Sequence, residues 1–195
     1  MKPFFIICLT ILLNACGGNE YTPKPHAYPR AYLPKKQYYN FDTSAPYSFQ
    51  IPTYSVIREY SAENKKHPYW YNIYYLPFNA TLHLSYLDFK TRIEFDDLFN
   101  DTRKLVYKHD IKAEEIDEIE IHNQKADFTG IIYELKGNTA TNLNFYVSDG
   151  KKHFLRGALY FNNQTKMDSI QPYFDYLKTD VIHLINTIKW KEIKN

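Results

Sequence analysis

Residues 126–162 constrain the fold more than any other stretch of this sequence. Three runs typical of strands lie there, at residues 126–135, 142–148 and 152–162, and apolar and polar residues alternate in the second and third of them. A period of two residues is typical of strands, and the Asp149-Gly150 dipeptide between the last two runs is a strong signal for a hairpin turn. The side chains expected to point inward in those two runs are Leu143, Phe145, Val147, Leu155, Gly157, Leu159 and Phe161. The pattern predicts a meander of antiparallel strands.

Two segments have the spacing of amphipathic helices. The C-terminal one carries apolar residues three or four positions apart, at Ile170, Phe174, Leu177, Val181, Leu184 and Ile188. We expect Asp168 or Ser169 to cap its start, with Pro172 in the first turn. The earlier helix follows Thr91, which has capping-box spacing with Glu94. Its apolar face is predicted to contain Phe95, Leu98, Phe99, Thr102, Leu105 and Val106.

The remaining predicted strands fall at residues 47–60, 69–76, 81–87 and 119–122. Residues 69–76 and 126–135 are apolar on both faces, so helices are expected on both sides of the sheet. The predicted fold class is therefore α+β, a mostly antiparallel sheet flanked by helices in an α/β/α sandwich, with the long C-terminal helix packed on the sheet. The order of the elements is similar to that of the Mog1/PsbP-like folds.

The N-terminus indicates export. Lys2 precedes an apolar run at residues 4–13, which is too short to span a membrane and typical of a secretory signal peptide. The run ends in Leu13-Asn14-Ala15-Cys16, which resembles a bacterial lipobox. We therefore predict that residues 1–15 are cleaved and that Cys16 carries the lipid, palmitate being the expected kind of acyl chain. The alternative is an ordinary signal peptide that happens to carry a cysteine near its cleavage site.

Residues 16–46 have the composition of a tether. Five prolines fall between residues 23 and 46, and they favour extended, polyproline-like backbone. At ~3.1 Å per residue, about twenty such residues would span ~60 Å. Tyrosines alternate with these prolines and have no use in a pure spacer, so part of the segment is expected to pack along the domain or a partner. Residues 47–195 are predicted to form a single globular domain.

This arrangement resembles the gliding motility lipoprotein GldD family of Bacteroidetes over essentially the whole chain. The motifs that carry the resemblance are the lipobox, Tyr21-Thr22-Pro23-Lys24-Pro25, Tyr28-Pro29-Arg30 and Leu33-Pro34. The resemblance implies a protein that is required for cell movement over surfaces and associated with the type IX secretion machinery. It implies no catalytic residue.

The residue after Cys16 bears on localisation. Gly17 is not the aspartate that retains many lipoproteins at the inner membrane, so the outer membrane is predicted. Lipoproteins exported to the cell surface in Bacteroidetes carry an acidic cluster behind the cysteine, and here only Glu20 stands near. The domain is therefore expected to face the periplasm, with the cell surface as the alternative.

The sequence contains no pattern typical of catalysis, a metal site or nucleic-acid binding. No pair among its seven histidines has the spacing of a zinc-binding helix, and the acidic residues 114–120 lack the central glycine of a calcium loop. No Gly-x-Ser-x-Gly elbow or phosphate-binding glycine loop is present. A net charge of +2 gives no reason to expect nucleic-acid binding. Cys8 and Cys16 are the only cysteines, so the mature domain retains no free thiol. We predict no enzyme activity, no cofactor and no metal.

Two functions remain open. The first is a non-catalytic lipoprotein that docks protein components of the gliding or secretion machinery. Its candidate docking residues are Tyr21, Pro23, Pro25, Tyr28, Pro29, Tyr32 and Trp70. The second is a periplasmic module that binds glycan or peptidoglycan by aromatic stacking, for which the ring-rich residues 69–75 are the candidate surface. A weaker third possibility is an enzyme with a dispersed active site.

Overall fold

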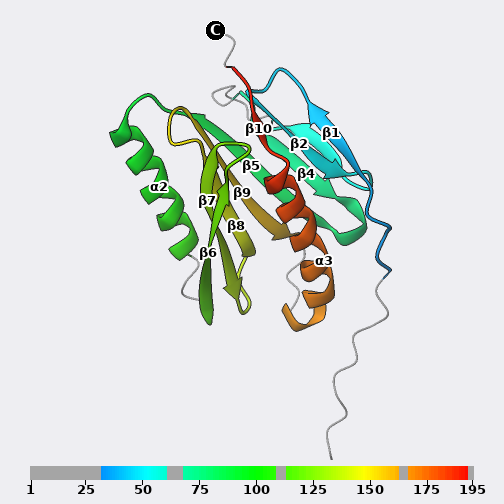
Figure 1. The fold of residues 1–195 in the computed structure, drawn as a ribbon. Coiled ribbons are helices and arrows are strands. Elements are labelled where there is room, and N and C mark those ends of the chain that lie inside the picture. Colours follow the sequence, from blue (N-terminus) through cyan, green and yellow to red (C-terminus); the bar gives the residue numbers. More distant parts are fainter. Residues whose placement is uncertain (1–31, 61–67, 109–112, 163–166, 193–195) are drawn as a thin grey trace, which may run out of the picture.

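A seven-stranded antiparallel sheet forms the centre of the computed structural model, which describes residues 32–60, 68–108, 113–162 and 167–192 (Figure 1). The strands lie in the order β3-β4-β5-β9-β8-β7-β6. Their bounds are β3 Val56–Glu59, β4 Tyr71–Tyr75, β5 Ala80–Asp88, β6 Glu115–Asn123, β7 Phe128–Lys136, β8 Thr141–Ser148 and β9 His153–Phe161. The predicted meander is confirmed, with Gly150 at φ 68° in the turn between β8 and β9.

A second, smaller sheet consists of β1 (Tyr38–Asp42), β2 (Tyr47–Pro52) and β10 (Lys189–Trp190), with β2 in the middle. Residues 38–42 lie within the predicted tether, and β1 is not among the predicted strands. The structure corrects this boundary, because all five residues of β1 pair with β2, from Tyr38 opposite Pro52 to Asp42 opposite Ser48. The folded domain therefore begins before residue 47.

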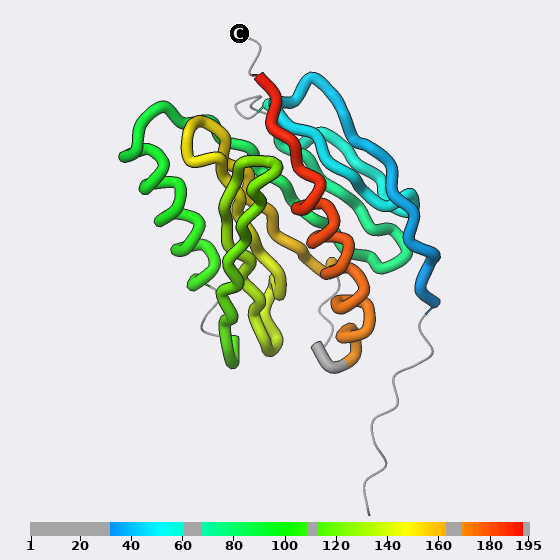
Figure 2. The backbone as a smooth tube through the Cα atoms, in the orientation of Figure 1, coloured from blue at the N-terminus to red at the C-terminus, as the bar shows by residue number. Residues whose placement is uncertain are grey.

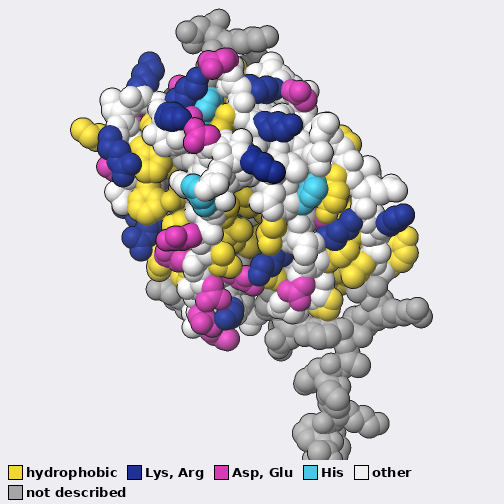
Figure 3. All heavy atoms as spheres, viewed as in Figure 1, with side chains coloured by type: hydrophobic (Ala, Val, Ile, Leu, Met, Phe, Trp, Pro, Cys, Tyr) yellow, Lys and Arg dark blue, Asp and Glu magenta, His cyan; other side chains and the backbone are white. Residues whose placement is uncertain are grey.

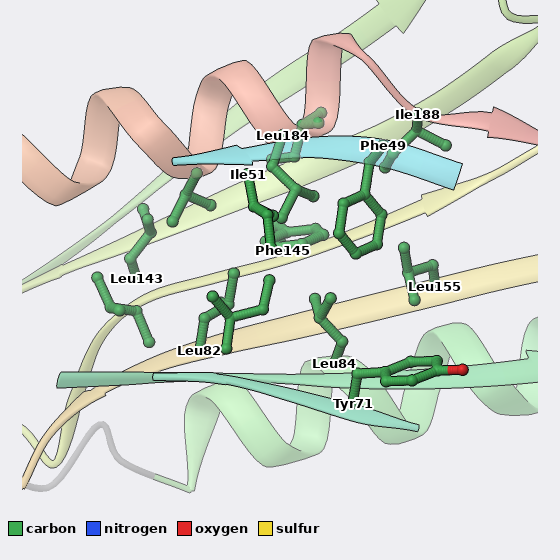
Figure 4. Close-up of a cluster of buried hydrophobic side chains, with 14 of the residues drawn as sticks. Phe49, Ile51, Tyr71, Leu82, Leu84, Leu143, Phe145, Leu155, Leu184 and Ile188 are labelled. Carbon is green, nitrogen blue, oxygen red and sulfur yellow. The ribbon is translucent and has the colours of Figure 1, made fainter. Parts of the chain in front are cut away.

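The layers differ on the two sides of the large sheet. The helix α3 (Met167–Asn186) and the small sheet cover one face, and the helix α2 (Arg92–Tyr107) lies on the other (Figures 1 and 4). A short 3₁₀ helix, η1 (Leu76–Phe78), links β4 to β5. Helices thus flank both faces as predicted, but part of one outer layer is a second sheet rather than a helix. Figure 2 shows that the described chain starts beside the N-terminal half of α3 and finishes at the opposite end of that helix.

The main core lies between the large sheet and the layer formed by α3 and the small sheet. Figure 4 shows Phe49 and Ile51 of β2 and Leu184 of α3 facing Leu82, Leu84 and Phe145 of the large sheet. The predicted stripe on α3 is confirmed at Phe174, Leu177, Val181 and Leu184, which are all at most 1% exposed. Of the other two predicted residues, Ile170 is only partly buried, and Ile188 is 1% exposed but lies beyond the end of the helix at Asn186. The hydrophobic effect over this surface is the main term that holds α3 in place.

Gly157 of β9 is required by the same core. A Cβ atom at this position would lie 2.2 Å from Cε1 of the Phe145 ring, a separation that atoms do not reach. The ring of Phe145 therefore occupies the space above the backbone of β9 that any side chain would fill.

The helices confirm one of the predicted details, the capping box of α2, and contradict two others. The capping box of α2 is present, with Thr91 Oγ1 accepting from the Glu94 amide and Glu94 accepting from the Thr91 amide. The expected inward position of Leu105 is wrong, because its side chain is 49% exposed. The expected cap of α3 is also wrong. The helix begins at Met167, which places Asp168 and Ser169 inside it and Pro172 beyond the first turn.

Candidate functional site

The segment that enters the domain from the N-terminal region is bound to α3 around Asp180. This residue is 0% exposed although its side chain is a carboxyl group. Its Oδ1 atom accepts from Lys36 Nζ at 2.7 Å and from the Tyr38 hydroxyl at 2.7 Å. Its Oδ2 atom accepts from the Tyr54 hydroxyl. We call Lys36, Tyr38, Tyr54 and Asp180 the Asp180 cluster. Because a buried carboxylate is costly unless it is paired and hydrogen-bonded, these three donors are what allow it to be buried.

Tyr176, one turn before Asp180, extends these contacts along α3. Lys36 Nζ donates to the Tyr176 carbonyl at 2.8 Å and lies 3.9 Å from the centre of the Tyr176 ring. The Tyr176 hydroxyl in turn donates to the carbonyl of Pro34. On the other side of the cluster, the ring of Tyr38 stacks on His183 at 3.7 Å. Residues 34–38 are thus fixed to α3, which confirms the expectation that part of the tether packs along the domain.

The electrostatics of the cluster are those of a structural site. Burial, followed by the hydrogen bond to Asp180, raises the pKa of the Tyr54 hydroxyl far above its ordinary value. The same two causes raise the pKa of Tyr38. Both hydroxyls therefore keep their protons at physiological pH and serve as donors. Burial also raises the pKa of Tyr75, whose hydroxyl has no hydrogen-bond partner among the described residues.

The Asp180 cluster is not among the predicted sites, although the sequence contains one signal for it. Asp180 lies three residues after Leu177 and four before Leu184, which places it on the apolar stripe of the helix. An acidic residue on a buried stripe needs donors, which Lys36, Tyr38 and Tyr54 supply. Their sequence positions, more than 120 residues away, gave no indication of this pairing.

The residues predicted to dock partners are only partly described. Cys16, Tyr21, Pro23, Pro25, Tyr28 and Pro29 lie outside the described residues. Tyr32 is 84% exposed. Trp70 is partly buried against the main core, its indole N–H donates to the Tyr86 carbonyl at 2.8 Å, and its ring centre lies 5.8 Å from that of Tyr60. The two described candidates therefore differ, because Tyr32 is open to solvent whereas Trp70 contributes to the packing of the domain.

The ring-rich strand β4 supplies mostly core. Tyr71 and Tyr75 are buried, and Tyr69 and Trp70 pack partly buried against the same core. Tyr74 points to the other face of the sheet, where the Arg58 guanidinium lies 5.8 Å from its ring centre. This strand therefore does not present a row of exposed rings on which a sugar could stack.

A groove of about 920 Å³ lies at the end of the molecule where β10 pairs with β2. His153 lines it, 1% exposed, with its Nδ1 atom 2.7 Å from the Tyr86 hydroxyl and its ring stacked on Trp190 at 5.0 Å. Burial lowers the pKa of His153, so the ring is neutral near pH 7. Two lysines of the groove are paired with carboxylates, Lys152 with Glu192 at 3.1 Å and Lys191 with Asp42 at 2.7 Å. Figure 3 shows charged side chains of both signs interspersed on the face it presents.

The acidic and histidine side chains do not form a metal centre in the described ranges. These ranges contain no group of three or more His, Cys, Asp or Glu side chains placed to hold a metal ion. Two carboxylates of the acidic stretch on β6, Glu115 and Asp117, instead form ion pairs with Lys136 at 2.6 and 3.1 Å. Neither described helix combines the length and the hydropathy needed to cross a bilayer.

Comparison with known proteins gives one strong match. The sequence model of a family described as gliding motility lipoprotein GldD matches residues 18–190. No curated protein matches the chain. Among solved structures, the chain is similar to the solution structure of cyanobacterial PsbP (CyanoP) from Synechocystis sp. PCC 6803. The identity is 12% and the TM-score 0.44, over 76% of this chain and 93% of that one. That similarity is too weak to carry an argument, so the resemblance to Mog1/PsbP-like folds stays a prediction.

Proposed function

The chain belongs to the gliding motility lipoprotein GldD family, and from that premise we propose that it is a non-catalytic part of the gliding apparatus that works by docking other proteins. The family makes it a lipoprotein of the cell envelope associated with gliding motility. Docking of protein components, and association with the type IX secretion machinery, are our proposal. The absence of a catalytic pattern in the sequence favours docking over chemistry.

The proposed anchor is a lipid on Cys16 in the outer membrane, with the domain facing the periplasm. Gly17 behind the cysteine and the lack of an acidic cluster there support this placement. Two or more acyl chains are needed for stable anchoring, since each buried CH₂ contributes ~0.8 kcal/mol.

The observation that carries the proposal is the binding of residues 34–38 to α3. The Asp180 cluster ends the tether at a fixed point on the domain, so the reach of the anchor is set by residues 16–33. Those eighteen residues would span at most ~56 Å in polyproline conformation. A docking protein must hold its binding surface close to its partners. The length of the free part of the tether sets how far from the membrane that surface can lie.

Among the candidate docking residues that the structure describes, Tyr32 is the better placed to contact a partner. Its ring is 84% exposed and stands just before the residues that bind α3. Tyrosine is enriched in protein interfaces because it offers a large rigid surface and a hydroxyl. The proposed docking surface consists of Tyr32 together with Tyr21, Pro23, Pro25, Tyr28 and Pro29.

Site-specific photo-crosslinking in motile cells tests this surface. A photoreactive residue at Tyr32 should form adducts with defined envelope proteins. The same residue at Ile93 on α2, which is 74% exposed, serves as the matched control and should form none of them. Equal adducts from both positions would contradict a docking role for the tether.

A replacement in the chain separates docking from spacing. Residues 17–31 are exchanged for glycine and serine at equal length, which leaves Cys16 and the Asp180 cluster intact. We expect colony spreading to be lost although the protein is made, folded and labelled by fatty acid. Full spreading would mean that the tether is only a spacer. Proteolysis of intact cells tests the placement, because ready loss of the domain would contradict a periplasmic position.

A further inference from the structure

The face of the large sheet that carries α2 is only partly covered by that helix. A pocket of about 300 Å³ lies beside the C-terminal half of α2, where Thr102, Leu105 and Val106 form one wall. Three neighbouring strands supply the floor and the opposite side, chiefly through His83 and Ser85 of β5, Asn144 of β8, and Arg156, Ala158 and Tyr160 of β9.

The strand register explains why a hollow forms at this place. One row across the sheet runs from Ser85 through Arg156 to Tyr146, and the next runs from His83 through Ala158 to Asn144. Ala158 stands in the middle of the second row, between two longer side chains. Its single methyl group leaves the floor of the pocket low, and Arg156 and Asn144 lie diagonally across from each other at its edge.

Arg156 is a cation without a carboxylate partner. It is half-buried, and within the described ranges its guanidinium forms no ion pair or hydrogen bond, whereas those of Arg92 and Arg103 each pair with an acidic residue. The charge of Asp101 on α2 acts to raise the pKa of Arg156, but Asp101 is itself paired with Lys104 at 3.3 Å. Burial lowers the pKa of the Arg156 guanidinium, which shows that desolvation outweighs the influence of Asp101. The guanidinium stays charged all the same.

Asn144 adds an unused donor to the same pocket. Its side chain is buried, with the residue 8% exposed, and its Nδ2 atom has no hydrogen-bond partner among the described residues. Its Oδ1 atom is 3.4 Å from Thr141 Oγ1, whose single proton has a closer acceptor in the Leu159 carbonyl at 2.8 Å. A buried amide with a free N–H is uncommon in folded proteins and calls for an acceptor.

We propose that this pocket binds a carboxylate group, held by the guanidinium of Arg156 and the side-chain amide of Asn144. The planar fork of an arginine matches the two oxygens of a carboxylate, and the amide offers a third donor. One positive charge neutralises a monoanion, which favours a carboxylate over a doubly charged phosphate. Leu105, Val106 and the Tyr160 ring provide apolar contact for the part of the ligand that carries it.

His83 adds no second charge to the pocket. Its Nδ1 atom lies 2.7 Å from Asn72 Oδ1, and burial lowers its pKa, so the ring is neutral at pH 7. The volume is at the lower limit for small-molecule sites, so it suits a single short chain. Two sources of such a carboxylate fit these properties: a free small acid with an apolar body, and the C-terminal residue of a peptide.

Calorimetric titration of the full lipidated protein in detergent tests the proposal. The first probe is N-acetyl-leucine, with N-acetyl-leucinamide as the uncharged match. The second is Gly-Gly-Leu, with its C-terminal amide as the match. We expect at least one acid to bind and its amide to bind at least about tenfold more weakly, the loss expected for a charge-assisted hydrogen bond. Binding of the free acid alone identifies a small ligand, and binding of the peptide alone identifies a chain end. Equal affinity for acid and amide, or no binding of either acid, would overturn the proposal.

Variants locate the site. Arg156→Met should weaken binding of the acid at least about tenfold, whereas the control Arg103→Met on the outer side of α2 should leave it unchanged. If Arg156 had only a structural role, its replacement would lower the melting temperature. We expect no decrease, because the side chain has no partner to lose.

Ala158→Leu fills the floor of the pocket and should abolish binding with the fold intact. Asp101→Asn removes a competing negative charge and should tighten binding. Unchanged affinity in both Arg156→Met and Ala158→Leu would place the ligand elsewhere.

Discussion

The two faces of the large sheet differ in whether a buried ionisable side chain has partners within the chain. On the α3 face, Asp180 is 0% exposed and receives hydrogen bonds from Lys36, Tyr38 and Tyr54. On the α2 face, Arg156 is half-buried and faces a pocket without a carboxylate partner among the described residues. The comparison shows that residues of the chain itself supply the partners of Asp180. For Arg156, the proposed partner is a ligand.

The largest effect is expected from a charge placed in the core of the α3 face. Leu184→Asp buries an unpaired carboxylate at a position that is 0% exposed. The cost is several kcal/mol, against a typical total stability of about 5–15 kcal/mol, so the domain should unfold. Leu105→Asp on α2 is the matched control and should melt at the temperature of the unmodified protein, because that side chain is half-exposed. Thermal unfolding followed by circular dichroism compares them, and a folded Leu184→Asp would show that the α3 face is not the core.

Asp180→Ala should have the next largest effect. It removes the common acceptor of three donors and leaves a lysine and two tyrosine hydroxyls without it, which costs about 3–5 kcal/mol for a broken buried pair. Lys36→Met is expected to cost less, because Asp180 keeps both tyrosines. Urea titration of the two single variants and the double variant gives the coupling energy. A coupling of zero would mean that Lys36 contributes nothing to the burial of Asp180.

Adjacent residues of β9 compare the packing of the two faces. Gly157→Ala inserts one methyl group into the ring of Phe145 on the α3 face and should destabilise by about 1–3 kcal/mol. Ala158→Leu adds more atoms on the α2 face, but into the pocket, and should cost less. The midpoints of urea unfolding of the two variants measure which substitution destabilises more. A larger loss of stability in Ala158→Leu would show that the pocket closes in solution.

The smallest effect concerns pH. Burial lowers the pKa of His153 in the folded chain, while the unfolded chain has the ordinary value near 6.5. The unfolded state therefore binds more protons below that value. The stability contributed by neutral His153 is fully present above pH 6.5 and is lost as the pH falls toward the folded pKa. His153→Gln should reduce the loss of unfolding free energy between pH 7 and 5 more than His83→Gln does, because His83 is more exposed. A larger change in the His83 variant would contradict this assignment.

Much of the fold could be predicted because its signals are local. The steps of three and four from Leu177 to Leu184 and the spacing of Thr91 and Glu94 each depend on a few neighbouring residues, and both features are present. β1 could not be predicted, because Tyr38–Asp42 does not alternate in burial and is ordered by pairing with β2.

The two charged sites were hidden for a related reason. Arg156 alternates with inward residues of β9, so the period of two residues made it an ordinary outward side chain. Its relation to Asn144 and His83 depends on the register between strands that are up to about seventy residues apart in sequence. Asp180 was visible as an acid on an apolar stripe, but two of its three donors, Lys36 and Tyr38, belong to a segment whose prolines indicated a free tether.

The attachment of residues 34–38 to α3 also decides where mechanical load enters the domain. A pull on the lipid end is transmitted first to Pro34 and Lys36, and through them to Tyr176 and Asp180 in the middle of a helix packed on the main core. It reaches β1 only afterwards. β1 is an edge strand that pairs with β2 alone, and a strand peeled from its end loses its hydrogen bonds one after another. Because the contacts on α3 bear the force before β1 does, they distribute it over a buried surface.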